Sequence, residues 1–100
     1  MTLRISENAE RDLETIWCYL ASVSKQEEIA SSVVHGIVET CEFLARNPGA
    51  GSKRDALRPG LRGFPVGKYI IYYWLQHEAV LVARILHAMR DQPRAYLAWD

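Results

Sequence analysis

Two apolar runs in the last third of the chain constrain its fold more than any other feature. Residues 69–75 and 80–86 are rich in β-branched and aromatic side chains, and the polar residues 76–78 separate them. This pattern is typical of two strands joined by a tight turn, so it predicts an antiparallel β-hairpin. Arg84 lies within the second run, where a charge is costly unless it is paired or reaches a surface. Arg84 therefore marks either an internal ion pair or a functional surface.

A third strand is predicted just before this hairpin. Residues 61–66 form a shorter apolar run, and Gly67 and Lys68 separate it from the hairpin as a tight turn. Pro65 has no N–H to donate to a neighbouring strand, which restricts the run to a sheet edge or a bulge. The three runs together predict an antiparallel meander. Both hairpin strands are apolar on both faces, so one face is expected to carry helices and the other to meet something else.

The first half of the chain predicts two amphipathic helices. One apolar stripe with three- and four-residue spacing runs through residues 9–20, and a second runs through residues 30–44. Ser6 or Asn8 is expected to cap the first helix, because short polar side chains accept hydrogen bonds from the free N–H groups there. Residues 3–5 precede the cap and alternate as a short edge strand does.

The linker between the two helices is short. Ser24 and Glu27 match a capping box, which predicts the start of the second helix. Gly36 weakens the middle of that helix, and its small size predicts close packing on the first helix. Pro48 ends the helical pattern, since proline cannot continue the hydrogen-bond ladder. Helices joined by so short a linker are expected to form an antiparallel hairpin, and the predicted fold class is α+β.

The composition favours one packed domain over residues 1–100. Apolar residues make up 49% of the 100 residues, enough for a core without metal or disulfide staples. No apolar run reaches membrane-spanning length and residues 1–7 lack an apolar signal region, so a cytoplasmic location is expected. Cys18 and Cys41 fit no metal-ligand spacing and are expected to be free, packed thiols.

The charges are unevenly distributed although the net charge is zero. Residues 5–45 hold eight acidic residues against two basic ones, a balance of −6. Residues 46–100 hold nine basic residues against four acidic ones, a balance of +5, and Arg4 supplies the remaining charge. A molecule with an acidic helical side and a basic side is therefore expected. Such a basic face suits nucleic acid or an acidic protein, and the alternative is that both faces are merely solvated.

Arg84 and His87 are the candidate site residues within the last strand. A structural role for Arg84 would be an ion pair with a helical acid such as Glu14 or Glu42. His87 is either a catalytic candidate or a hydrogen-bonded histidine at a strand end. The aromatic residues of the preceding strand are mostly expected in the core, although one face could offer rings to a partner.

A second set of candidates surrounds the end of the last strand. Arg90 and Tyr96 would line a basic cleft with Arg58 and Arg62, a set suited to gripping phosphates. Alternatively, Arg90 and Asp91 form an end-capping pair that contributes little at a surface. A Ser-His-Asp set, a phosphate loop, a metal-ligand cluster and a close carboxylate pair are all missing from the pattern. The residues alone therefore predict no reaction.

Five segments of the chain together resemble a known family. In order they are residues 9–20, 44–51, 58–62, 69–73 and 84–91. With them the chain resembles the RelE/ParE superfamily of type II toxin–antitoxin toxins, and most closely the ParE branch, over nearly its whole length. The resemblance implies an α+β fold in which an N-terminal strand and an antiparallel helical hairpin pack on a curved antiparallel β-sheet.

The resemblance also implies a protein partner. Toxins of this superfamily pair with a small antitoxin, usually a ribbon-helix-helix DNA-binding protein such as a ParD-like antitoxin, whose C-terminal segment wraps the toxin. The complex commonly represses its own operon, so operator DNA is expected to be bound only through the antitoxin. No membrane partner, metal or cofactor is expected.

The branch of the superfamily decides the expected activity. RelE-like members cleave mRNA on the ribosome with several basic residues and a C-terminal tyrosine, to which Arg62, Arg90 and Tyr96 can be matched. The mid-sheet arginine of those nucleases falls on Tyr69, and a second base falls near Phe64. Losing these groups removes most of the charge stabilisation that such cleavage needs in its transition state.

ParE-like members lack the nuclease set and are understood to poison DNA gyrase by stabilising its cleaved-DNA complex, through binding alone. The resemblance therefore predicts a non-enzymatic gyrase inhibitor that arrests growth and is neutralised by a ParD-like antitoxin. The predicted partner-binding residues are Arg58, Arg62, Tyr69, Tyr73, Arg84, His87, Arg90 and Tyr96. One alternative is a ribosome-dependent mRNA endonuclease that uses Arg62, Arg84, Arg90 and Tyr96. Another is an inert toxin-fold protein that acts only in operon autoregulation.

Overall fold

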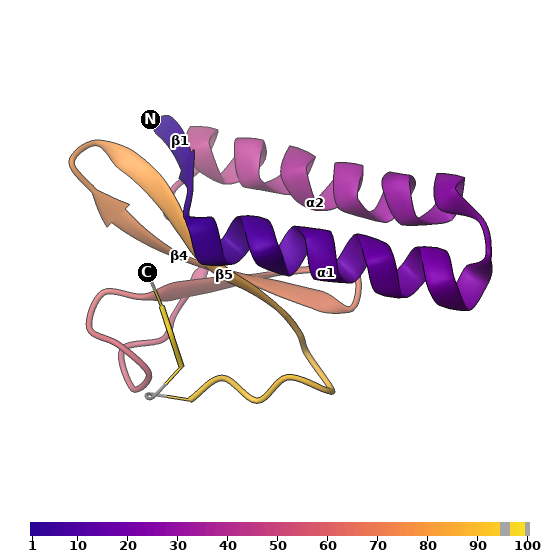
Figure 1. The fold of residues 1–100 in the computed structure, drawn as a ribbon. Coiled ribbons are helices and arrows are strands. Elements are labelled where there is room, and N and C mark those ends of the chain that lie inside the picture. Colours follow the sequence, from indigo (N-terminus) through magenta and orange to yellow (C-terminus); the bar gives the residue numbers. More distant parts are fainter. Residues whose placement is uncertain (95–96, 100) are drawn as a thin grey trace.

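The computed structural model describes residues 1–94 and 97–99, and it folds as a helical hairpin on one face of a five-stranded sheet (Figure 1). The elements in chain order are β1 (Thr2–Ile5), α1 (Glu7–Ser24), α2 (Glu27–Arg46), β2 (Ser52–Lys53), β3 (Arg62–Val66), β4 (Tyr69–Gln76) and β5 (Ala79–His87). Both predicted helices and the three strands of the predicted meander are present. The loop end of the helical hairpin reaches beyond the sheet (Figure 1).

Ser6 joins the start of α1 to the sheet. Its Oγ accepts a hydrogen bond from Ala9 N at 3.0 Å and donates one to Ala83 O at 2.9 Å. One side chain thus satisfies a free N–H of the first helical turn and ties the helix to β5. The prediction of a cap at Ser6 or Asn8 is confirmed, with Ser6 as the capping residue.

The predicted capping box at the start of α2 is wrong. The helix begins at Glu27 with Gln26 as its N-cap, and no side chain caps it. Ser24 instead belongs to the last turn of α1, where its Oγ donates to Leu20 O at 2.6 Å. A serine at a helix end can bond to the carbonyl four residues back, and this bond competes with capping the next helix.

The sheet is mixed, with the strand order β1-β5-β4-β3-β2. β3, β4 and β5 form the predicted antiparallel meander, and β2 adds a short antiparallel partner for β3. β1 is an edge strand as predicted, but it runs parallel to β5, so the sheet is not purely antiparallel. The parallel pair arises because the helical hairpin crosses over one face of the sheet between β1 and the later strands.

The turn between β4 and β5 has the backbone of a two-residue hairpin. Gln76 pairs with Ala79, and the two central residues His77 and Glu78 both have positive φ, 49° and 59°. This conformation matches the right-handed twist of the flanking strands. The polar residues between the two apolar runs therefore form the tight turn that their position predicts.

A bulge in β5 changes which residues share a face of the sheet. Tyr72 pairs with Arg84 but Tyr73 pairs with Val82, so Ala83 is an extra residue without a partner in β4. Strict alternation along an unbroken strand would place Arg84 on one face with Val80, Val82 and Leu86. The bulge prevents this, because Leu86 packs with Ala83 on one face while Val80 and Val82 pack on the other.

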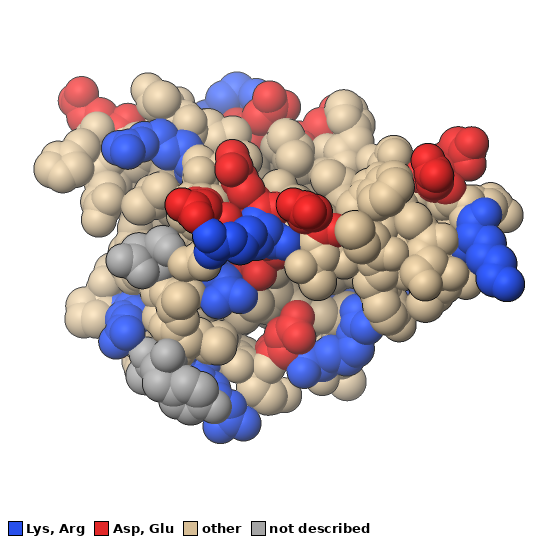
Figure 2. All heavy atoms as spheres, in the orientation of Figure 1, with Lys and Arg blue, Asp and Glu red and all other residues tan. Residues whose placement is uncertain are grey.

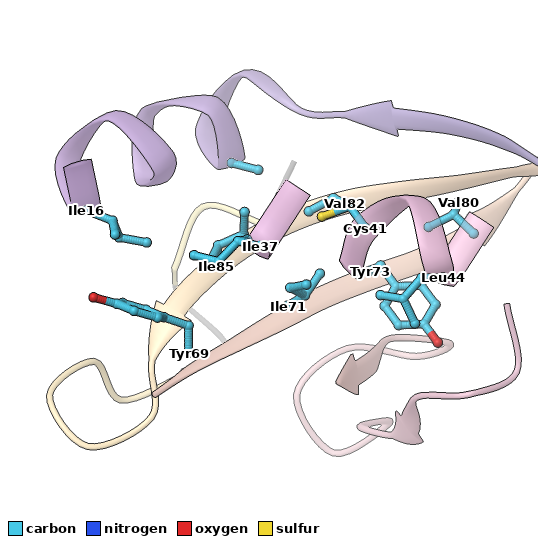
Figure 3. Packing of buried hydrophobic residues seen from close by; sticks show 11 residues of the cluster. Ile16, Ile37, Cys41, Leu44, Tyr69, Ile71, Tyr73, Val80, Val82 and Ile85 are labelled. Carbon is cyan, nitrogen blue, oxygen red and sulfur yellow. The ribbon is translucent and has the colours of Figure 1, made fainter. Parts of the chain in front are cut away.

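The core lies in two clusters on opposite faces of the sheet. The larger cluster packs the helices onto the sheet and includes Ile37, Cys41 and Leu44 of α2 above Ile71 and Tyr73 of β4 (Figure 3). Cys41 is fully buried as expected, whereas Cys18 is free but exposed, so its predicted packing is wrong.

The chain itself covers the second face. The smaller cluster joins Leu61, Tyr72, Ala83, Leu86 and Trp99, and Leu57 and Leu97 pack against it. After β5 the C-terminal segment runs back below the sheet (Figure 1). The face that was expected to meet something else is therefore occupied in part by the chain's own loop before β3 and by Leu97 and Trp99.

Candidate partner-binding site

Arg84 forms an internal ion pair with Asp12 of α1. Its Nε and Nη2 donate to the two carboxylate oxygens of Asp12 at 2.8 and 2.9 Å, and its Nη1 donates to Ala98 O at 2.8 Å. Asp12 also accepts from Ile85 N at 2.9 Å. Only 17% of the Arg84 side chain and 14% of the Asp12 side chain are exposed. The hydrogen bonds to Asp12 raise the pKa of Arg84, and burial opposes this rise.

The acid that pairs with Arg84 is therefore not Glu14 or Glu42, which were the predicted examples. Both of those side chains are exposed. Asp12 lies three residues after Ala9 and four before Ile16, the two buried residues of α1, so it shares their face of the helix. The face of α1 that packs on the sheet is thus the face that supplies the carboxylate.

Arg62 and Tyr73 secure the loop that follows α2. Arg62 Nη1 donates to Gly51 O at 2.7 Å. Tyr73 Oη donates to Pro48 O at 2.8 Å and accepts from Gly51 N at 2.9 Å. Tyr73 is fully buried, and a Cβ on Gly51 would lie only 2.5 Å from its hydroxyl oxygen. These two candidate residues therefore hold the loop between α2 and β3 in place.

Tyr69, His87 and Arg90 lie together at the other end of the sheet. The rings of Tyr69 and His87 meet edge to face at 5.3 Å, and Tyr69 is buried. Burial raises the pKa of Tyr69, and the charge of Arg90 partly offsets this rise. The Arg90 guanidinium lies 4.4 Å from the ring centre of Tyr19 on α1. Met89 and Arg90 are exposed, so this end of the molecule offers a cation and apolar surface to a partner.

His87 has a defined role in this corner of the structure. Its Nδ1 accepts hydrogen bonds from the backbone N–H groups of Met89 and Arg90, both at 3.1 Å. Its own N–H donates to the Asp91 carboxylate at 2.8 Å. His87 and Asp91 thus shape the turn after β5, which corresponds to the interpretation of His87 as a hydrogen-bonded strand-end residue. Asp91 forms no salt bridge with Arg90 within the described residues.

Arg58 lines a separate hollow on the opposite face of the sheet from the helices. The hollow has a volume of about 390 Å³ and is also lined by Trp74, Leu97 and Trp99. Tyr96, the last predicted site residue, lies outside the described residues. The candidate residues are therefore distributed over the two ends and both faces of the sheet, and they do not form one cleft.

This distribution limits what chemistry the described residues can perform. Of the three described members of the nuclease set, Arg62 bonds the loop after α2, Arg84 bonds α1 and Arg90 lies on Tyr19. Phosphate cleavage needs several cations directed at one reacting phosphate. Among residues 1–94 and 97–99, no group of three metal-ligating side chains is found either.

An apolar groove between the helices and the β3–β4 turn is the main feature that the sequence did not predict. Its volume is about 500 Å³. Its lining consists of Leu20, Ser32, Val33, Gly36, Ile37, Val66, Gly67, Lys68 and Tyr69. The prediction that Gly36 packs closely on α1 is wrong, because a Cβ at Gly36 would meet nothing within 4 Å. Gly36 lies in the middle of an otherwise strongly helical segment, and this glycine is the sequence feature that could have indicated the groove.

Two solved structures with this architecture come from toxin–antitoxin systems. The chain superposes on a structure titled "Chromosomal ParDE TA system from P. aeruginosa" with a TM-score of 0.74 at 26% identity, covering 87% of this chain and 95% of that one. It also matches a chain of the RelBE2 toxin–antitoxin complex from Mycobacterium tuberculosis, with a TM-score of 0.59 at 23% identity over 86% and 95% of the two chains. The second match shows the fold alone.

Sequence comparison narrows this class to one family. The model of the family described as "ParE toxin of type II toxin-antitoxin system, parDE" matches residues 3–92. Toxin ParE1 of Caulobacter vibrioides is 31% identical over 97 residues, which cover 94% of this chain and 95% of that protein. The chain therefore belongs to the ParE toxin family of type II toxin–antitoxin systems. The predicted resemblance and the predicted fold class are both confirmed. None of the helices in the described part of the chain has the length and apolar character needed to cross a membrane.

Proposed function

We propose that this toxin inhibits DNA gyrase by trapping its cleaved-DNA complex, and that a ParD-like antitoxin neutralises it. The observation that carries the proposal is the internal engagement of Arg62 and Arg84. A guanidinium that already bonds a carboxylate and a carbonyl has few donors left for a phosphate. With Tyr69 and Phe64 in place of bases, the positions matched to the nuclease set supply few free cations for catalysis. This supports an activity by binding, and gyrase as target implies a cytoplasmic location.

The proposal is tested by adding the purified toxin to gyrase with plasmid DNA and ATP, and separately to programmed ribosomes. Linear plasmid covalently linked to gyrase is the expected product, and ribosome-bound mRNA should stay intact. Cuts in mRNA at the ribosomal A-site would replace the proposal with an endonuclease activity. If neither substrate changes while the toxin is folded, the protein acts only as a partner of its antitoxin.

The apolar groove beside Gly36 is the proposed docking place for the antitoxin. Its lining is mostly aliphatic, and Lys68 stands at its rim. A segment of the antitoxin with aliphatic side chains and a nearby acidic residue would complement both features. Such docking would bury surface that the free toxin leaves open to water, which is the main source of affinity between proteins.

A pair of leucine substitutions tests this docking place. Gly36→Leu puts a side chain into the groove, whereas Gly49→Leu adds the same side chain in a loop outside it; a Cβ meets nothing within 4 Å at either position. The affinity for the antitoxin is expected to fall by about tenfold or more for Gly36→Leu, the loss of about 1.4 kcal/mol of contacts, and to be retained by Gly49→Leu. Equal affinities measured by calorimetry for the two variants would place the antitoxin elsewhere.

A further inference from the structure

Three arginines lie near Trp99 or its neighbour Tyr72, on the face of the sheet that the helices leave free. Arg58 lines the same hollow as Trp99, and the backbone of Arg94 accepts a hydrogen bond from Trp99 Nε1 at 2.9 Å. Trp99 meets Tyr72 edge to face at 5.3 Å, and the charge of Arg54 acts on the Tyr72 hydroxyl. We call Arg54, Arg58 and Arg94 the arginine face.

Within the described residues, no guanidinium of the arginine face forms an ion pair. The ion pairs there link Arg11 to Glu7, His35 to Glu39 and Arg84 to Asp12. Asp55, between Arg54 and Arg58 in the chain, accepts a hydrogen bond from Gly60 N at 2.7 Å, and Asp91, three residues before Arg94, accepts one from His87 N at 2.8 Å. Neighbouring cations without anions repel one another, so a ligand with several negative charges would be stabilised here.

The opposite side of the molecule carries the negative charge. Seven acidic residues of α1 and α2 are exposed: Glu7, Glu10, Glu14, Glu27, Glu28, Glu39 and Glu42. Figure 2 shows red side chains gathered over the helices and several blue side chains in the lower part of the molecule, below the sheet. A polyanion would be repelled from the helices and attracted to the arginine face, which fixes the orientation of its approach.

The hollow beside the arginine face holds a fixed aromatic ring. Trp74 lines the hollow together with Arg58, and its Nε1 donates to Pro59 O at 3.0 Å, which holds the half-buried ring in place. Residues 74–76 of β4 pair with β5 alone, because the pairing of β4 with β3 ends at Tyr73. An acidic peptide strand is therefore the competing ligand at this edge, and polyglutamate serves as its probe. The proposed gyrase activity favours DNA, because the cleaved complex contains DNA and a phosphate backbone suits unpaired guanidinium groups.

We propose that the arginine face binds the sugar–phosphate backbone of duplex DNA, independently of base sequence. The inference rests on the proposed gyrase activity, because it identifies how the toxin holds the DNA within the cleaved complex. It concerns phosphate contacts and is separate from operator recognition, which the antitoxin is expected to supply. Three phosphate contacts predict a slope of log K against log salt of about −2.7, and hence weak, strongly salt-dependent binding.

The experiment measures binding of the purified toxin to a fluorescein-labelled duplex of about 20 base pairs by anisotropy, for two unrelated sequences, from about 50 to 200 mM salt. The Arg58→Gln/Arg94→Gln double variant is compared with Arg11→Gln/Lys25→Gln, which removes the same charge from exposed positions of the helical hairpin. The Arg58→Gln/Arg94→Gln variant should bind DNA about tenfold more weakly at the lowest salt. Its slope of log K against log salt should become less steep by about two. The control should bind within about twofold of the unchanged toxin.

Several results would overturn the inference. One is that the toxin does not bind DNA at low salt. Another is that the two double variants lose the same affinity for DNA. A third is that polyglutamate with the same number of negative charges binds more tightly than DNA. Circular dichroism and thermal unfolding check that both variants fold, and Arg58→Lys/Arg94→Lys should restore most of the affinity. Trapping of gyrase on plasmid is measured in parallel. Trapping that survives loss of the arginine face overturns this inference alone, whereas DNA binding without any trapping overturns the proposed gyrase activity.

Discussion

Arg84 and Asp12 form the most constrained contact between a helix and the sheet. Both side chains are mostly buried, and together they hold β5, α1 and the backbone of Ala98. Removing one member leaves the other as an unpaired charge away from water, which costs far more than the pair contributes by itself.

The first prediction concerns this ion pair. Arg84→Ala and Asp12→Ala should each lower the free energy of unfolding by about 3 kcal/mol, and the double variant should lose clearly less than the sum of the two. Urea unfolding followed by circular dichroism measures all three variants. Arg90→Ala, which removes an exposed arginine, serves as control and should cost less than about 1 kcal/mol. A loss at Arg84 no larger than at Arg90 would refute the structural role.

A second residue-scale prediction concerns Gly51. Gly51→Ala places a Cβ 2.5 Å from the Tyr73 hydroxyl oxygen, so the buried tyrosine or the loop must move and lose hydrogen bonds to Pro48 and Gly51. The expected loss of unfolding free energy is about 2 kcal/mol. Gly49→Ala in the same loop meets nothing within 4 Å and should be nearly neutral. Similar urea midpoints for the two variants would contradict this account of the loop.

At the scale of elements, α2 carries a glycine that its helix does not require. Gly36 lies in open space beside the groove, so an added methyl group has room. Gly67 also has open space around it, but its φ of +57° is one that side chains with a Cβ adopt only at a cost. Comparing alanine substitutions at Gly36 and Gly67 therefore separates the effect of backbone conformation on stability from the effect of side-chain packing.

The element-scale prediction follows from this comparison. Gly36→Ala should raise the free energy of unfolding by about 0.5–1 kcal/mol, since alanine loses less chain entropy than glycine in a helix. Gly67→Ala should lower it by about 1 kcal/mol through strain in the β3–β4 turn. Calorimetry of thermal unfolding measures whether each substitution raises or lowers the stability. If both variants shift the midpoint in the same direction, the environment of Gly36 differs from the open one described.

At the scale of the whole molecule, burial makes the core sensitive to alkaline pH. Burial raises the pKa of Cys41 from 9.0 to about 12, and burial also raises the pKa of Tyr69 and Tyr72. In the unfolded chain these protons leave at lower pH than in the folded protein. Stability is therefore fully present below about pH 9 and falls as the pH rises further, because the unfolded state then binds fewer protons.

The expected loss from Cys41 alone is about 1.4 kcal/mol per pH unit above pH 9. Unfolding free energies measured near about pH 8 and about pH 10.5 give the slope. Cys41→Ala should be less stable at both values but show a shallower slope, and Cys18→Ala, at an exposed position, should keep the original slope. An unchanged slope in Cys41→Ala would assign the alkaline loss to other groups.

Local pattern predicted most of the fold. The helical stripes, the cap at Ser6, the turn at residues 76–78 and the edge position of β1 each depend on neighbours in sequence, and all are present. The predictions that failed depend on contacts between residues far apart in the chain. The capping box is one example: Ser24 can bond either the end of α1 or the start of α2, and the path of the chain between the two packed helices decides which bond forms.

The candidate site was predicted as a list of residues, and the tertiary structure decided what each one does. Sequence showed that Arg84 is a charge in an apolar strand, but the bulge at Ala83 decided its face and the orientation of α1 selected Asp12 as its partner. Nor could periodicity reveal that Arg62 bonds a loop residue 11 positions away in the chain, or that Tyr73 bonds residues of the same loop 22 and 25 positions away.

By itself the sequence determined both helices, β1 and the three strands of the meander, their order and the division of charge between helices and sheet, because these follow from local propensity and composition. The toxin family came from the resemblance of five segments to known toxins. Only the tertiary structure decided which cations are paired and which are free. An ion pair forms where two side chains from distant segments meet away from water, and that meeting depends on the packing of α1, α2 and the C-terminal segment on the sheet. Arg84 is thereby held in a mostly buried ion pair, and Arg54, Arg58 and Arg94 remain available to a partner.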